Sequence, residues 1–106
     1  MDNIHAFRRV KREDVVDVIR EIAELESDKV FMATHAELRM FEREITLNQV
    51  IRTLQFGDVI EGPEWDTKID AGWKVLMRHV TAGEYVSVAA KLIDCVDDTV
   101  CVITVY

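Results

Sequence analysis

The chain has 106 residues, of which 49% are hydrophobic and 31% are charged, and its formal net charge is −7. This length and balance are typical of one globular domain over residues 1–106 and exclude a disordered or fibrous chain. No hydrophobic run approaches the roughly 18–20 residues that span a bilayer, and the charged N-terminus lacks the apolar segment of a signal peptide, so we expect a cytoplasmic protein with no membrane partner. A net negative charge repels nucleic acid, so no DNA partner is expected, and RNA binding would require a local basic patch.

Residues 13–25 have the spacing of an amphipathic helix. Hydrophobic side chains recur every three or four residues on one face and charged side chains take the other: Val15, Val18, Ile19, Ile22 and Leu25 against Asp17, Arg20, Glu21 and Glu24. We therefore expect residues 1–29 to form a tail and this helix. The short β-prone run at residues 30–32 predicts a strand.

Two short helices are predicted next. Thr34 and Glu37 have the spacing of a capping box, in which each side chain accepts a hydrogen bond from the other residue's backbone. The first helix is therefore expected over residues 35–44. Thr46 and Gln49 repeat the same spacing and predict the start of a second helix.

Beyond the second helix the pattern changes to strands. Gly57 is expected to end the helix as a left-handed C-cap. Residues 58–60 predict a short strand, and residues 61–72, which include the only proline and two glycines, predict a loop. Three β-rich runs with short turns then predict an antiparallel meander at residues 73–80, 85–93 and 99–106. The expected fold is α+β, with an N-terminal helix, a short strand, two short helices and a meander of three to four strands.

Cys95 and Cys101 are separated by five residues across an acidic turn, without the spacing of a metal site. We expect both to be reduced structural thiols, with a disulfide between the strands of this hairpin as the alternative. Neither a bound metal nor a cofactor is expected.

His35, Arg39 and Arg43 are the residues whose spacing most strongly indicates a site. At 100° per residue they form one narrow stripe of the first short helix. Two arginines four residues apart repel each other by a few tenths of a kcal/mol, so the stability of the helix does not explain the arrangement. An anion bound across the stripe would explain it, because guanidinium groups bind phosphate bidentately and histidine exchanges protons near neutral pH.

The alternative is that carboxylates of this same chain neutralise the stripe. Glu42 lies three residues from Arg39, and residues 58–70 carry five carboxylates against Lys68 alone. If these groups fold over the helix, the stripe is an internal ion-pair network with no ligand.

The run from Thr34 to Gly57 has the pattern T-H-A-x-x-R-M-x-x-R-x-I-T-x-x-x-V-x-x-x-L-x-x-G, followed by D-V-I-E and a terminal V-I-T-V-Y. These motifs resemble the domain-of-unknown-function family 4258 (DUF4258), and the resemblance covers about residues 30–106. It implies a compact α+β domain whose helical face packs beside the sheet. This chain departs from the family at Tyr85, because many members carry a histidine at the start of that strand.

The order of elements also resembles that of MqsR-type toxins and, more distantly, RelE-like ribonucleases. This resemblance implies that some relatives cleave RNA, for which a base, an acid and cations for the phosphorane charge are needed. The residues predicted for these roles are His35 or Glu61 as the base and, on phosphate, the cations Arg39, Arg43, Lys74 and Arg78.

Two functions are therefore expected. One is a toxin-like ribonuclease or anion-binding protein, whose partners are RNA and a cognate antitoxin-like protein. The other is a non-catalytic interaction module that forms a homodimer through strand edges or the N-terminal helix.

Overall fold

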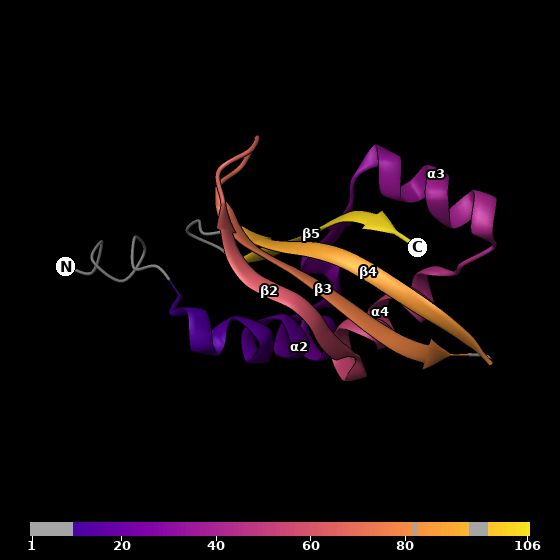
Figure 1. Cartoon of the computed structure of the whole chain (residues 1–106), viewed down its shortest axis with the longest axis horizontal. Coiled ribbons are helices and arrows are strands. Elements are labelled where there is room, and N and C mark those ends of the chain that lie inside the picture. Colours follow the sequence, from indigo (N-terminus) through magenta and orange to yellow (C-terminus); the bar gives the residue numbers. More distant parts are fainter. Residues whose placement is uncertain (1–9, 82, 94–97) are drawn as a thin grey trace.

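The computed structural model describes residues 10–81, 83–93 and 98–106, and shows an α+β fold (Figure 1). The helical elements come first and a four-strand meander follows. In chain order they are η1 (Arg12–Asp14), α2 (Val15–Leu25), η2 (Ser27–Lys29), β1 (Val30–Met32), α3 (Thr34–Arg43), α4 (Leu47–Phe56), β2 (Asp58–Asp66), β3 (Gly72–Thr81), β4 (Glu84–Ile93) and β5 (Thr99–Val105). The predicted order of elements is confirmed. None of the helices in the described residues is long and apolar enough to cross a membrane.

The five strands form one sheet in the order β1-β5-β4-β3-β2. Strands β2 to β5 pair antiparallel as the predicted meander. The short strand β1 joins the far edge and pairs parallel with β5, with Val30 opposite Val100. The segment that follows β1 is therefore held beside β5, at the opposite edge of the sheet from β2.

One face of the sheet is covered by α2 and α4, which lie together on that side (Figure 1). The alternation of the strands directs the core residues to this face, including the buried Val75 and Met77 of β3. The helices contribute the buried Ile19 and Leu54. Arg20 connects α2 to the end of α4, because its guanidinium donates hydrogen bonds of 2.9 Å to the main-chain carbonyls of Gln55 and Gly57.

Helix α3 stands apart from these two helices, beside β5 (Figure 1). It starts one residue earlier than predicted, and the Thr34–Glu37 capping box is wrong. The cause is that the β1 pairing continues through Ala33, whose N–H donates to Val102 O at 2.9 Å. Ala33 is thereby held extended as the N-cap and Thr34 falls inside the helix. The second predicted capping box, between the side chains and backbones of Thr46 and Gln49, is confirmed.

The turn out of α4 also differs from the prediction. Gly57 has φ −71° and ψ 162°, so it is extended and not a left-handed cap. Its lack of a side chain is required by space, because a Cβ would lie 2.5 Å from Thr53 O and 2.9 Å from Arg78 O. Gly57 therefore leads directly into β2.

Strand β2 is much longer than the predicted strand at residues 58–60. It continues to Asp66 through a cis Gly62–Pro63 peptide bond, with register shifts against β3 on both sides of Gly62. The predicted loop at residues 61–72 is therefore wrong over its first half. Trp65, within β2, packs edge-on against Trp73 of β3, with ring centroids 5.3 Å apart.

Candidate functional site

The face of the sheet opposite α2 and α4, which we call the open face, carries the polar side chains of the meander. Because side chains alternate along a strand, Lys74 and Arg78 of β3 point away from the buried Val75 and Met77. Strand alternation over residues 73–80 of the sequence likewise predicts Lys74, Leu76 and Arg78 on one face and Trp73, Val75, Met77 and His79 on the other. The neighbouring strand β4 brings Tyr85, Ser87, Ala89 and Lys91 to the same face.

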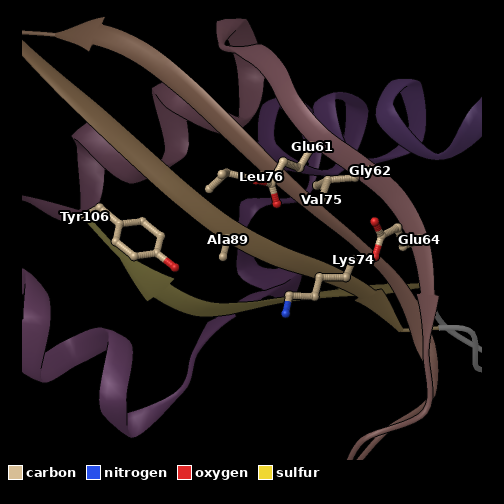
Figure 2. Close-up of a pocket in the computed structure, with 8 residues that line it drawn as sticks. All are labelled: Glu61, Gly62, Glu64, Lys74, Val75, Leu76, Ala89 and Tyr106. Carbon is tan, nitrogen blue, oxygen red and sulfur yellow. The ribbon is translucent and has the colours of Figure 1, made fainter.

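A pocket of about 130 Å³ lies on the open face between β2 and the end of β5. Figure 2 shows Lys74 and the ring of Tyr106 extending over the sheet from either side of Ala89, with Glu61 and Glu64 on the β2 side. We call it the Glu61 pocket; it is lined by Glu61, Gly62, Glu64, Lys74, Val75, Leu76, Ala89 and Tyr106.

Tyr106 is held at this pocket by its backbone. Its N–H donates to Ser87 O at 2.9 Å and its carbonyl accepts from Ser87 N–H at 3.3 Å, so the β4–β5 ladder continues to the last residue. The phenol ring is thus fixed over the open face and is half exposed.

The charges around the Glu61 pocket do not neutralise one another by ion pairing. Glu64 lies opposite Lys74 in the β2–β3 register, and Asp58 lies opposite Arg78. Within the described residues, no ion pair of 4.0 Å or less joins these carboxylates to these cations. Both signs of charge are therefore presented to a ligand.

Arg78 lies further along β3, at a second hollow lined by Asp58, Ile60, Arg78, His79, Val80 and Tyr85. Its Nε donates to Ser87 Oγ at 3.2 Å, and its guanidinium carbon is 5.8 Å from the centroid of the Tyr85 ring. Arg78 lies four positions after Lys74 along the strand, which puts their Cα atoms about 13 Å apart. The Arg78 guanidinium is held on Ser87 and Tyr85, and Tyr85 pairs with Val80, further from Lys74, so a ligand that contacts both cations must be longer than one phosphate group.

Lys91 is a functional candidate that sequence reasoning missed. It is only 5% exposed, and its Nζ lies 3.2 Å from Asp66 Oδ2. It also donates to Lys68 O at 2.8 Å and Asp70 O at 2.9 Å, which ties the β2–β3 loop to the sheet. The signal in the sequence is its position, because Lys91 is the only charged residue between Tyr85 and Ile93.

The predicted stripe of α3 lies away from these pockets. His35 and Arg43 are exposed, and Arg39 forms a 3.9 Å ion pair with Glu42 of the same helix. Arg39 Nε is buried and has no hydrogen-bond partner in the part of the chain that the structure describes.

The acidic segment at residues 58–70 does not cover the stripe. Most of this segment forms β2 and the following loop at one edge of the sheet, whereas α3 packs beside β5 and β1 at the other. Of the predicted site residues, the structure brings Glu61 and Lys74 into one pocket, places Arg78 in the next hollow, and keeps His35, Arg39 and Arg43 on a separate helix.

His79 and Cys101 lie outside both the Glu61 pocket and the stripe of α3. His79, on the helical side of β3, lies with its ring centroid 6.2 Å from that of Phe56. Cys101 of β5 is a free thiol, and Cys95 lies outside the described residues. No group of three or more metal-ligating side chains gathers within residues 10–81, 83–93 and 98–106.

Comparison with known proteins identifies one family. Its model, described as a domain of unknown function (DUF4258), matches residues 32–106. The match extends from the end of β1 to Tyr106 and includes all three helical-stripe residues and the whole Glu61 pocket. No curated protein and no solved structure matches the chain.

Proposed function

The chain belongs to the DUF4258 family, whose description assigns no activity. We propose that the open face of the sheet binds single-stranded RNA and cleaves it. The observation that carries the proposal is the Glu61 pocket, in which two carboxylates, an ammonium group and a phenol converge without neutralising one another. The resemblance in element order to MqsR-type and RelE-like toxins that the sequence suggests is an analogy of fold, and fold by itself does not determine function.

RNA fits the open face better than a small anion does. Lys74 and Arg78 are too far apart for one phosphate group, but successive phosphates of a strand can reach both. Tyr85, which is 71% exposed, and Tyr106, which is 46% exposed, offer aromatic rings on which unpaired bases stack. Cations interleaved with exposed aromatic side chains are typical of proteins that bind single strands.

The Glu61 pocket supplies the groups that cleavage by the 2′-hydroxyl requires. Glu61 takes the proton of the 2′-hydroxyl, whose oxygen attacks the adjacent phosphorus. Lys74 stabilises the negative charge that develops on the phosphorane oxygens. The bond from phosphorus to the 5′-oxygen breaks, and the Tyr106 hydroxyl gives that oxygen a proton. The products are a 2′,3′-cyclic phosphate and a 5′-hydroxyl end.

The stripe of His35, Arg39 and Arg43 has a binding role in this proposal. Helix α3 lies beside β5, the strand that leads to Tyr106 (Figure 1). Phosphates of a strand that leaves the Glu61 pocket on that side pass the exposed His35 and Arg43. These residues therefore contribute affinity, and Glu61, Lys74 and Tyr106 contribute the chemistry.

The test is cleavage of a fluorescent single-stranded RNA by purified protein in the presence of a metal chelator. Wild type is expected to produce fragments with cyclic phosphate ends. Glu61→Gln and Lys74→Met are each expected to slow cleavage by about 10²-fold or more, the usual contribution of a base or of a group that stabilises the transition state. If purified wild type leaves all RNA intact, or if Glu61→Gln cleaves as fast as wild type, the proposal is wrong.

A matched pair of arginines provides the control. Arg78→Met removes a guanidinium that lies over Tyr85 on the open face, and Arg52→Met removes one that lies over Phe56 on the helical side, 5.4 Å from its ring centroid. The first change is expected to weaken RNA binding and the second to leave it unchanged. Equal effects would show that net charge alone governs binding.

A second candidate function, homodimerisation, is favoured by exposed hydrophobic side chains on α3. Leu38 is 53% exposed and Phe41 is 83% exposed, one helical turn apart. The edge strands are less suited to pairing, because β1 has three residues and β2 is broken by register shifts. If this surface joins two copies, light scattering gives twice the monomer mass for wild type and the monomer mass for Phe41→Asp. A monomeric wild type at high concentration contradicts this function.

A further inference from the structure

A second pocket lies on the open face on the other side of Lys74 from the Glu61 pocket. It has a volume of about 240 Å³ and is bordered by the β2–β3 loop and by β4 and β5; we call it the Ile93 pocket. It is lined by the apolar or weakly polar residues Ala33, Ile69, Ile93, Cys101 and Ile103 and by the charged residues Asp66, Lys68, Asp70, Lys74 and Lys91. Lys74 lines both pockets, so a phosphate bound to it has the Glu61 pocket on one side and the Ile93 pocket on the other.

The wall of the Ile93 pocket is fixed before any ligand binds. The buried Lys91 joins the Asp66 carboxylate and the main-chain carbonyls of Lys68 and Asp70, so the loop cannot move without breaking three interactions of a buried charge. Asp66 Oδ1 also accepts a hydrogen bond of 3.0 Å from the N–H of Lys68. A wall held in this way lowers the entropy cost of binding.

Ile69 sits at the mouth of this pocket in an unusual state. Its side chain is 99% exposed, and its φ of 63° lies in the left-handed region, which β-branched residues rarely adopt. Neither feature contributes to the core of the protein. Strained residues of this kind cluster where a chain clamps a ligand.

We infer that the Ile93 pocket receives a nucleobase of the RNA strand, the one next to the phosphate that Lys74 binds. This inference rests on the proposed function and adds the specificity of the same site. Its apolar floor of Ile93, Cys101 and Ile103 suits the faces of an unstacked base. Its volume is below the roughly 300–1,000 Å³ of pockets for drug-sized ligands, so it suits one planar group.

The charge of the lining favours a nucleotide. Three lysines and two aspartates surround the pocket, in a chain whose net charge is −7. The Asp66 carboxylate already accepts from Lys91 and from the N–H of Lys68, so Asp70 supplies the carboxylate that accepts hydrogen bonds from the base. Adenine, cytosine and guanine carry an exocyclic amino group with two donor hydrogens for such an acceptor, whereas uracil offers only its single ring N–H. The pocket therefore prefers a base with an exocyclic amino group to uracil.

Cys101 provides a direct reporter of occupancy, because it lines the pocket. In a Cys95→Ser, Glu61→Gln protein, which has one thiol and is expected to cleave about 10²-fold more slowly than wild type, the rate of alkylation by iodoacetamide is measured with and without RNA. The experiment is run at alkaline pH, since burial raises the pKa of the Cys101 thiol. At an RNA concentration ten times Kd, an adenine oligonucleotide is expected to slow alkylation about tenfold.

Two controls separate the base from the backbone. An oligonucleotide of the same length with abasic sites, and inorganic phosphate, are each expected to leave the alkylation rate unchanged, and a uracil oligonucleotide to protect less than the adenine one. Equal protection by the abasic and adenine oligonucleotides overturns the inference. Absence of protection by any oligonucleotide that binds also overturns it.

Filling the pocket gives an independent measurement. Cys101→Phe is expected to weaken binding of the adenine oligonucleotide about tenfold, roughly the contribution of one base contact, and to leave binding of the abasic one unchanged. Arg52→Met, on the helical side of the sheet, is expected to bind both oligonucleotides as wild type does. If wild type cleaves RNA but no base-dependent protection of Cys101 is seen, the base pocket is refuted and the proposed nuclease activity stands. If protection of Cys101 depends on the base but wild type does not cleave RNA, the nuclease activity is refuted and the base pocket stands.

Discussion

Lys91 is the only charged side chain that is buried in the part of the chain that the structure describes. A buried charge is tolerated only where hydrogen bonds replace its water, and here Asp66 and two main-chain carbonyls do so. Lys91→Met should therefore lower the free energy of unfolding by about 2–3 kcal/mol, because it leaves these acceptors unpaired. Urea denaturation measures the change.

Lys74→Met is the matched control for that measurement. Lys74 is exposed on the same face and has no ion pair within 4.0 Å among the described residues, so its replacement should change stability by less than about 0.5 kcal/mol. If both variants unfold at the same urea concentration, the network around Lys91 does not stabilise the loop.

Asp66 makes the same network sensitive to acid. The N–H of Lys68 and, after it, the ammonium of Lys91 lower the pKa of Asp66 below its ordinary value of 3.8, against the opposing effect of burial. A lowered pKa in the folded state stabilises the fold above the unfolded-state value, and this stabilisation is lost as the pH falls through the folded-state pKa. The stability difference between wild type and Asp66→Asn should therefore be constant near neutral pH and shrink below about pH 4. A difference that grows on acidification would contradict this linkage.

At the scale of elements, β2 depends on a glycine at its centre. Gly62 has φ 86°, and a Cβ there would lie 2.5 Å from Lys74 O of the paired strand. Gly83 in the next turn has a similar φ of 80° but nothing within 4 Å of a Cβ. Gly83→Ala should lower the free energy of unfolding by about 1–2 kcal/mol, the cost of a left-handed conformation for alanine. Gly62→Ala should lower it clearly more, because β2 must also move away from β3. Thermal unfolding of both variants measures the difference. Equal losses of stability would show that β2 can move to accommodate the added Cβ without a further cost.

The elements that the sequence predicted well are those determined by local interactions. The Thr46–Gln49 box begins α4 as expected, because both partners lie within one helical turn. The prediction failed at Thr34 and Gly57, whose conformations are set by distant segments: Ala33 pairs with Val102, and Gly57 lies against Arg78. Spacing along the chain carries no information about either contact.

At the scale of the whole molecule, the contrast between local interactions and contacts with distant segments explains which parts of the candidate site could be predicted. The sequence placed Lys74 and Arg78 on one face of a strand, because alternation is local. It did not predict that Glu61 lies beside Lys74, since this depends on two register shifts in β2. Nor did it place the stripe of α3 relative to the sheet, which depends on the parallel pairing of β1 with β5.

The contribution of that stripe to RNA binding can be measured through salt. For a single strand, the logarithm of the affinity falls with the logarithm of salt concentration with a slope of about −0.7 for each phosphate neutralised. If only Lys74 and Arg78 touch phosphate, the slope should be about −1.4; if Arg39 and Arg43 also do, it should be about −2.8. Because the proposed function includes the stripe, the steeper slope is expected for wild type and the shallower one for an Arg39→Gln, Arg43→Gln protein. The same slope in both proteins would show that RNA stays on the sheet and never reaches α3.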